Sequence, residues 1–336
     1  MVQSHASRRR GGVAVLAAFV LVLLLLMVAF AVDLGYLFTV RTELQAAADA
    51  GALAGSAELA ASQSQAATVA KDFVRRNADV TDEGVGVEFG HWDFSGRSFS
   101  PGVAPYDAMQ VTVRKTDTPL FFGKMAGQAA TQNVAGRATA AYRPRDIVLV
   151  LDYSGSMNAQ GRIQELKDSV ALFIFTLQEI EAEDRVALVR YSTQGEMAIP
   201  LTTDLDRVNS TAQGVNADGW TNIGHGMELA RLELTSHARS HAAKMMIVMT
   251  DGKVNRPQGT DPKTYVIDEA GRARDEGITA VTISFGDDAD RTLMQQVADI
   301  TKGVHFNVPD SVSGYEDDLR AVFRKIAVNR PVILVQ

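Results

Sequence analysis

The sequence predicts an α/β protein: a doubly wound, mostly parallel sheet preceded by a transmembrane helix, a long alanine-rich helix and a small β-rich module. Two observations lead to this prediction. From Arg145 onward, short apolar runs alternate with amphipathic stretches, as buried parallel strands alternate with crossover helices. Near the N-terminus, twenty residues (13–32) carry no charge. We expect an N-terminal segment at 1–60, a helix continuation with the β-rich module at 61–143, and the doubly wound domain at 144–330.

The uncharged run has the length of a membrane-spanning helix, because twenty residues at ~1.5 Å each cover the ~30 Å hydrocarbon core. A cleaved signal peptide is the alternative, since Ala29-Phe30-Ala31 fits the small-x-small cleavage pattern. The run exceeds the roughly 7–15 apolar residues of a signal peptide, so we favour a retained anchor. The arginines at 8–10 predict a short N-terminus in the cytoplasm and the bulk of the chain outside.

Small residues recur at every fourth position in the helical stretch that follows. They form two series: Ala47, Gly51 and Gly55, and Ala48, Ala52, Ser56 and Ala60. Such a face lets another backbone approach closely. We expect it to pack on the protein's own downstream domain; contact with another helix in an assembly is the alternative.

Residues 80–143 follow a different pattern. Segments 85–94 and 108–115 alternate by two, as half-buried strands do, and 134–144 is a third strand candidate. We expect a short helix at 119–127. Nothing in this module indicates a catalytic or metal-binding function.

The doubly wound domain is predicted from its apolar runs at 147–151, 185–191, 245–250, 278–285 and 303–308. Residues 196–201 follow the second run too closely for a crossover helix, so we predict an antiparallel edge strand there. One helix is predicted at Ile163–Ile180 from its apolar stripe. Another begins with Asp261 as N-cap and Pro262 at its first position, and ends before Gly277.

Polar residues follow two of these strands. Asp152 ends the first and Asp251 follows another, so both carboxylates are expected at the carboxyl edge of the sheet, where open α/β sheets bind ligands. Ser154 and Ser156 lie on the loop after the first strand, and Thr221 begins a helix. Two carboxylates and three hydroxyls form an all-oxygen donor set that suits a hard divalent cation such as Mg²⁺. A partner's carboxylate would complete the shell of such an ion.

Other functions are weaker candidates. Asp152 and the two serines alone would also suit a helix cap, but the additional Thr221 and Asp251 favour a metal. The sequence has neither a G-x-S-x-G elbow nor a Walker A loop, so we expect no enzymatic activity. The net charge of −7 argues against nucleic acid as a partner, and the lack of cysteine excludes thiolate sites.

The motif D-x-S-x-S at 152–156, with Thr221-Asn222 and the T-D-G at 250–252, resembles the three loops of a von Willebrand factor type A domain over about residues 145–326. The resemblance implies a metal-ion-dependent adhesion site whose ligands are Asp152, Ser154, Ser156, Thr221 and Asp251. It also implies Mg²⁺ as the ion, with Mn²⁺ or Ca²⁺ as alternatives, and a protein partner offering an acidic side chain. His225 stands where the family frequently has an acid, at a position that is not a ligand.

The first sixty residues resemble a second family, the TadE/TadG-like pilus-assembly proteins. The resemblance rests on the arginines before the span, "VDLGYLF" at 32–38 and "LQAAADAGALAGS" at 44–56. Together with the C-terminal domain, it resembles the TadG-like members. This implies a single-pass protein of the bacterial inner membrane that binds envelope or pilus-assembly components in assembling or anchoring Flp pili. The alternative is a structural subunit whose Ala/Gly-rich helix packs in the assembly, with the A domain as a scaffold.

Overall fold

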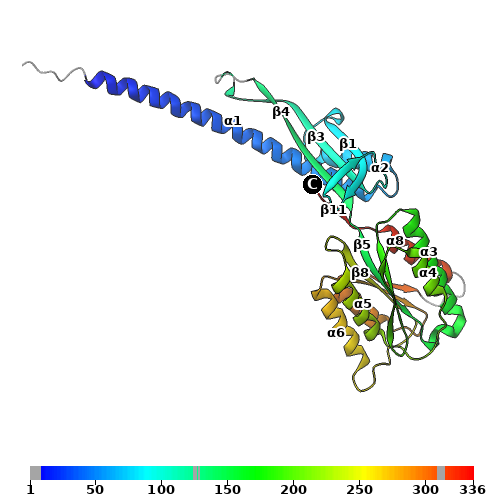
Figure 1. The fold of residues 1–336 in the computed structure, drawn as a ribbon. Helices are drawn as coiled ribbons and strands as arrows, with labels where there is room; N and C mark the ends of the chain where they lie inside the picture. The colour runs from blue at the N-terminus through cyan, green and yellow to red at the C-terminus, as the bar shows by residue number, and fades with distance from the viewer. Residues whose placement is uncertain (1–8, 124–126, 128, 309–314) are drawn as a thin grey trace, which may run out of the picture. The chain divides into compact units, whose positions relative to one another are not determined.

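The computed structural model describes residues 9–123, 127, 129–308 and 315–336 (Figure 1). The chain divides into two compact units. The first unit comprises Met1–Tyr142 and Val332–Gln336, and the second comprises Arg143–Pro331. The C-terminal residues therefore belong to the same unit as the N-terminal helix.

The first unit begins with two helices, α1 (Arg9–Ala57) and α2 (Gln63–Asn77). By length and composition, α1 is able to cross a membrane, and its large apolar side chains between 13 and 32 are exposed. Arg8 of the predicted cytoplasmic cluster lies outside the described residues. A turn separates the helices, and the Ser62 side chain then caps α2 by accepting a hydrogen bond from the Gln65 backbone N–H.

An antiparallel sheet completes the first unit, with strand order β11-β4-β3-β1-β2. Its elements are β1 (Val85–Asp93), β2 (Ser98–Pro101), β3 (Ala108–Pro119), β4 (Thr131–Tyr142) and β11 (Val332–Leu334), preceded by a short 3-10 helix η1 (Asp82–Gly84). The three predicted strands are confirmed. The sequence analysis missed β2 and β11, which are short. The short helix expected at 119–127 lies partly outside the described residues.

The small-residue face of α1 packs inside this unit. Ala47, Ala48 and Ala52 are fully buried in a cluster with residues of α2, β3 and β4. A Cβ added at Gly55 would lie 2.8 Å from both the carbonyl oxygen of Ala66 and the Cβ of Ala70 in α2. The expected packing on the chain's own residues is confirmed. Ala60, the last member of the predicted series, lies beyond the end of α1 and is exposed.

Replacing Gly55 with alanine should destabilise the first unit, because the new methyl group would overlap backbone that cannot move aside freely. Overpacking of this kind costs about 1–3 kcal/mol. Gly35→Ala is the matched control: the same helix has open space there, and alanine favours helix by up to about 1 kcal/mol. Denaturant unfolding of the full chain in detergent, followed by Trp92 fluorescence in a Trp220→Phe background, measures both. Equal stabilities of the two variants would contradict the tight α1–α2 packing.

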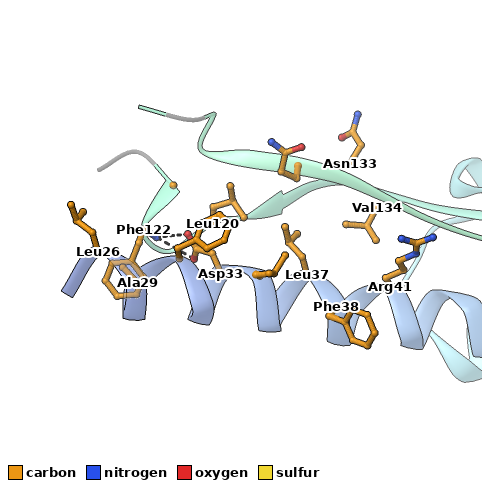
Figure 2. A pocket seen from close by; sticks show the side chains of 14 residues that line it. Leu26, Ala29, Asp33, Leu37, Phe38, Arg41, Leu120, Phe122, Asn133 and Val134 are labelled. Carbon is orange, nitrogen blue, oxygen red and sulfur yellow. Dashed lines mark hydrogen bonds between the residues drawn. The ribbon is translucent and has the colours of Figure 1, made fainter. Parts of the chain in front are cut away.

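Farther toward the N-terminus, α1 binds the end of the β3–β4 hairpin through Asp33 (Figure 2). The buried Asp33 carboxylate accepts backbone hydrogen bonds from Phe121, at 2.7 Å to Oδ1, and from Phe122, at 3.0 Å to Oδ2. Both N–H groups follow the last residue of β3, where ladder pairing has ended. An acid that follows an apolar span thus holds the hairpin end against the helix.

The second unit is a six-stranded sheet in the order β10-β9-β8-β5-β6-β7. Its strands are β5 (Arg145–Asp152), β6 (Arg185–Tyr191), β7 (Gly195–Thr202), β8 (Ala243–Thr250), β9 (Thr279–Phe285) and β10 (His305–Val308). All neighbours are parallel except β7, an antiparallel edge strand paired with β6. Every residue of β5 is buried, as its uninterrupted apolar run predicts.

Helices cover both faces of this sheet, which confirms the predicted doubly wound architecture (Figure 1). One core contains Ile147, Leu149 and Leu151 with α3 (Arg162–Glu179), α4 (Leu205–Gln213) and α8 (Tyr315–Val328). The other contains Val148 and Val150 with α5 (Ile223–His237), α6 (Pro262–Asp275) and α7 (Arg291–Ile300). The predicted N-cap is also confirmed, since Asp261 accepts from the Thr264 N–H.

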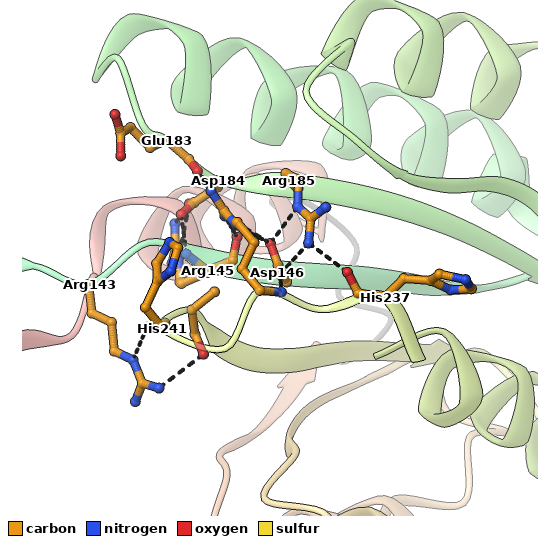
Figure 3. A network of polar contacts seen from close by, with 10 residues as sticks. Arg143, Arg145, Asp146, Glu183, Asp184, Arg185, His237 and His241 are labelled. Carbon is orange, nitrogen blue, oxygen red and sulfur yellow. Dashed lines mark hydrogen bonds and ion pairs between the residues drawn. The ribbon is translucent and has the colours of Figure 1, made fainter. Parts of the chain in front are cut away.

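Charged residues form a network at the amino ends of β5 and β6 (Figure 3). The Arg145 side chain is fully buried, and its Nη2 donates to Oδ2 of Asp184 at 2.6 Å. The same guanidinium donates to the carbonyl oxygens of Ile326 and Ala327 at the end of α8. Arg145 therefore joins the central strand to the last helix of the unit.

Candidate metal centre

Two acidic residues meet at the opposite, carboxyl edge of the sheet. Asp152 is the last residue of β5, and Asp251 directly follows β8. The two strands are parallel neighbours, with Val150 opposite Val248, so their ends lie at the same level. Both aspartates are fully buried. The topology thus brings together two carboxylates that stand far apart in the sequence.

Neutral groups surround the Asp152 carboxylate. Its Oδ1 accepts from the backbone N–H of Ser154 at 2.8 Å. Its Oδ2 accepts from the hydroxyl of Thr250 at 2.9 Å, and lies 3.2 Å from the hydroxyl of Tyr191, whose single proton is shared with the Met249 carbonyl oxygen at 2.6 Å. These donors fix the orientation of the carboxylate while leaving its charge largely uncompensated.

Hydroxyl groups connect the first loop to Asp251. Ser154 precedes a 3-10 helix, η3 (Gly155–Gly161), and its Oγ lies 3.0 Å from Oγ of Ser156. Ser156 Oγ in turn donates to Oδ1 of Asp251 at 2.6 Å. The two predicted serines and the second aspartate therefore form one continuous cluster of oxygen atoms.

Thr221 reaches this cluster from the loop before α5. A Cβ added at Gly252 would lie 3.4 Å from Ser156 Oγ and 3.9 Å from Thr221 Oγ1, so both hydroxyls face the same small space beside Gly252. Two hydrogen bonds to Asn255 hold the Thr221 loop: the Asn255 side-chain Oδ1 accepts from the Thr221 N–H, and the Asn255 backbone N–H donates to the Thr221 carbonyl. The His225 side chain has a different partner: its Nδ1 accepts a hydrogen bond from the Gly195 N–H.

Burial makes the site electrostatically unfavourable when only the protein's own charges are considered. Desolvation and then the nearby Asp251 charge raise the pKa of Asp152 from 3.8 to about 6. Desolvation also raises the pKa of Asp251, against hydrogen bonds from Ser156 and Arg162. Because the folded-state pKa of Asp152 exceeds its ordinary value, its charge opposes folding at neutral pH, and that cost is relieved as the pH falls through about 6.

The donor set fits a hard divalent cation. Carboxylate and hydroxyl oxygens are the ligands that such ions prefer, and a cation would offset the repulsion between the two buried carboxylates. The residues present therefore fit such an ion on their chemistry alone: two buried acids, one of them without a cationic partner among the contacts described, lie with hydroxyls from two loops.

Several residues around the site were not predicted. Arg162, nearly buried, donates to Oδ2 of Asp251 at 3.1 Å, and Tyr191 and Thr250 hold Asp152. Next to Thr221 in the sequence, Trp220 is 53% exposed, and the Arg256 guanidinium lies 4.1 Å from the centre of its ring. The sequence signal for Tyr191 was its position at the end of an apolar strand, and Thr250 belongs to the T-D-G motif at 250–252, in which no role was assigned to the threonine. No signal existed for Arg162, whose role depends on how α3 packs.

Comparison with known proteins identifies three matching families. Residues 146–318 match the von Willebrand factor type A domain. Residues 11–68 match the Flp pilus-assembly TadE/G-like family, and residues 45–140 match a Tad-like Flp pilus-assembly family. These matches fall in the two regions for which the sequence analysis gave a family resemblance, the first sixty residues and about residues 145–326.

Individual relatives match about half of the chain. The uncharacterised protein YfbK of Escherichia coli is 25% identical over 186 residues, 54% of this chain and 31% of the relative. Calcium-activated chloride channel regulator 3A-1 of Mus musculus is 29% identical over 49% of this chain and 17% of the relative. The chain thus spans less than a third of the length of these relatives.

Solved structures of low identity are similar to the chain. The vWF domain of the type V pili tip protein Mfa5 from Porphyromonas gingivalis has 18% identity and a TM-score of 0.47, covering 56% of this chain and 95% of that one. A von Willebrand factor type A protein from Catenulispora acidiphila has 17% identity and a TM-score of 0.48, covering 73% of this chain and 48% of that one.

Proposed function

Because the chain belongs to the von Willebrand factor type A domain family through residues 146–318, just over half of its length, we propose that it is a membrane-anchored, metal-dependent protein-binding module of Flp pilus assembly. The observation that supports this most directly is the cluster of Asp152 and Asp251 with hydroxyls at the carboxyl edge of the sheet. The TadE/G-like match at 11–68 supports the pilus-related setting.

In this proposal, Mg²⁺ is held by Asp152, Ser154, Ser156, Thr221 and Asp251, with Mn²⁺ or Ca²⁺ as alternatives. The ion would supply a Lewis-acidic position for an acidic side chain of the partner protein. The chain's own residues orient the oxygens: Thr250 and Tyr191 hold Asp152, and Arg162 holds Asp251. Trp220 and Arg256 would contact the partner around its acidic residue, since exposed aromatic and arginine side chains are common binding anchors.

The anchor in this proposal is the apolar stretch 13–32 of α1, in the bacterial inner membrane. The short N-terminus would be cytoplasmic, and the part of the chain after Asp33 would lie outside, by the positive-inside rule. The second unit would then face partners in the envelope or in the pilus-assembly machinery.

A structural subunit that packs through the Ala/Gly face of α1 is the less favoured alternative. Gly51 and Gly55 on that face already approach Val74, Ala66 and Ala70 of α2. The chain's own residues cover this face, so it offers little surface to another helix.

Capture of pilus-assembly components from detergent-solubilised envelopes tests the proposal. The full chain should retain them in Mg²⁺ and lose them in EDTA. Thr221→Val should weaken capture at least tenfold, because loss of even an indirect ligand contact typically costs 10–100-fold in metal affinity. Thr235→Val, at an exposed helix position away from the site, is the matched control. Equal capture with and without EDTA would exclude a metal-dependent mechanism.

A further inference from the structure

We propose that the end of the β3–β4 hairpin, Leu120–Gly123, is a second membrane contact, seated among the lipids of the leaflet from which α1 emerges. The inference rests on the proposed anchor at 13–32. It concerns the first unit only. It assigns membrane phospholipid as the binding partner of a surface that includes no residue of the candidate metal centre. Figure 2 shows the hairpin end lying along α1 beside Asp33 and Leu26.

The depth of the hairpin end follows from Asp33. This residue is the first charged one after the uncharged run, so it marks the level at which the helix leaves the hydrocarbon. Its carboxylate holds the backbone N–H groups of Phe121 and Phe122 at 2.7 and 3.0 Å. These are charge-assisted hydrogen bonds, which are stronger than neutral ones. The two phenylalanines are thereby fixed at the membrane–water boundary.

The hairpin end also extends back along the span. Leu120 and Phe122 line a cavity with Leu26, Ala29 and Phe30 of α1. Leu26 precedes Asp33 by seven residues, which is ~10 Å along a helix. This part of the cavity therefore lies at the level of the last two helical turns inside the bilayer.

The exposed side chains at this level are apolar and aromatic. Phe121 is 62% exposed and Phe38 is 71% exposed. Leu34, which lies between them along the axis of α1, is 54% exposed. The Phe121 ring meets Tyr36 edge to face, with 5.2 Å between ring centres. Large aromatic groups exposed together are unfavourable in water but favourable at the membrane interface, where aromatic belts form.

The cavity has the polarity of a phospholipid. Its volume is about 620 Å³. Apolar residues of the span line one end, and Arg41, Gln132 and Asn133 line the other. Arg41 lies eight residues beyond Asp33, ~12 Å farther along the helix and on the water side of the hydrocarbon boundary, from which a long arginine side chain is able to extend back to the lipid phosphates. An acyl chain would occupy the apolar end and the phosphate would lie near Arg41.

Depth-dependent quenching in proteoliposomes tests this inference. The chain has no cysteine, so single cysteines carry an environment-sensitive fluorophore without background. The full chain would be labelled at Phe121→Cys, with Phe122→Cys as a second site, in phosphatidylcholine–phosphatidylglycerol vesicles. The vesicles contain phospholipids brominated either near the headgroup or near the chain end. Leu21→Cys reports the span, and the exposed Ser95→Cys, in the β1–β2 turn, is the water-facing control.

We expect headgroup-proximal bromines to quench the label at 121 or 122 at least twofold more than the label at 95, with chain-end bromines acting most on the label at 21. Adding Asp33→Leu should abolish the excess at 121, because the hairpin end loses its acceptor, whereas Asp33→Asn, which keeps an acceptor oxygen, should retain it. Suppose that the label at position 21 is quenched but the labels at positions 121 and 122 are quenched no more than the label at position 95. This result would overturn the inference and leave the proposed anchor intact. An unquenched label at 21 would overturn the anchor and this inference together. Unchanged quenching at 121 in Asp33→Leu would overturn the positioning by Asp33.

Discussion

Asp251→Asn is expected to abolish stabilisation of the protein by Mg²⁺. In the wild-type chain, Mg²⁺ binding to a single site is expected to stabilise the fold by about 2.7 kcal/mol when the ion concentration is roughly one hundred times the dissociation constant. Asparagine keeps the shape of the side chain but removes one of two negative charges in a buried cluster of otherwise neutral oxygens. A divalent cation in that cluster depends on both carboxylates to offset the loss of its water shell.

The measurement is the denaturant midpoint of the full chain in detergent, followed by Trp220 fluorescence in a Trp92→Phe background, with and without Mg²⁺. Asp261→Asn is the matched control, because Asp261 is an exposed helix cap for which asparagine is an equally good substitute. It should keep the full response to Mg²⁺. Ser156→Ala is the second site variant, which removes a hydroxyl and leaves the pairing of Asp251 with Arg162. A wild-type Mg²⁺ response in both Asp251→Asn and Ser156→Ala would exclude this cluster as the metal site.

Arg145→Met should destabilise the second unit by about 3–5 kcal/mol, the usual cost of removing one partner from a buried ion pair. The loss would leave the Asp184 carboxylate, 2% exposed, without the guanidinium that contacts it at 2.6 Å. It would also leave two carbonyl groups at the end of α8 without their donors. Unfolding should become easier without any change in the metal centre, which lies at the opposite edge of the sheet.

Two further variants give this prediction its controls. Arg190→Met removes an exposed ion pair with Glu196, for which the expected cost is about 0–1 kcal/mol. The double variant Arg145→Met/Asp184→Leu should recover much of the lost stability, because no unpaired charge remains buried. The same Trp220 unfolding measurement serves for all three. A cost for Arg145→Met no greater than that for Arg190→Met would show that the buried network contributes little.

Local sequence was sufficient to predict most elements of the second unit. Uninterrupted apolar runs define β5 and β8 because strands covered on both faces have no polar side, and Asp261-Pro262 defines the start of α6 because those residues suit helix caps. Four of the five candidate metal ligands were recognisable for a related reason. Asp152 and Asp251 end or follow buried strands, and Ser154 and Ser156 lie on the loop after the first of these strands, whereas Thr221 was noted at the start of a helix.

The first unit was less predictable. Its fourfold spacing of small residues indicated a close-packed face on α1, but the partner of that face, α2, lies in no special sequence relation to it. The short strand β11 joins β4 across nearly two hundred residues, with Ile333 opposite Ala141. A strand of three residues has too few positions to show a period.

The sequence by itself determined the kind of sheet, the membrane-length helix and the types of oxygen available for a metal, because these depend on residues that are close together in the chain. The tertiary structure alone decided which groups meet. Strand order brings Asp251 beside Asp152, packing of α3 brings Arg162 to Asp251, and the hairpin end comes to Asp33. These contacts join residues separated by about ninety to one hundred positions. No local sequence pattern predicts them, because the free energy of such pairing comes from burial in the whole unit.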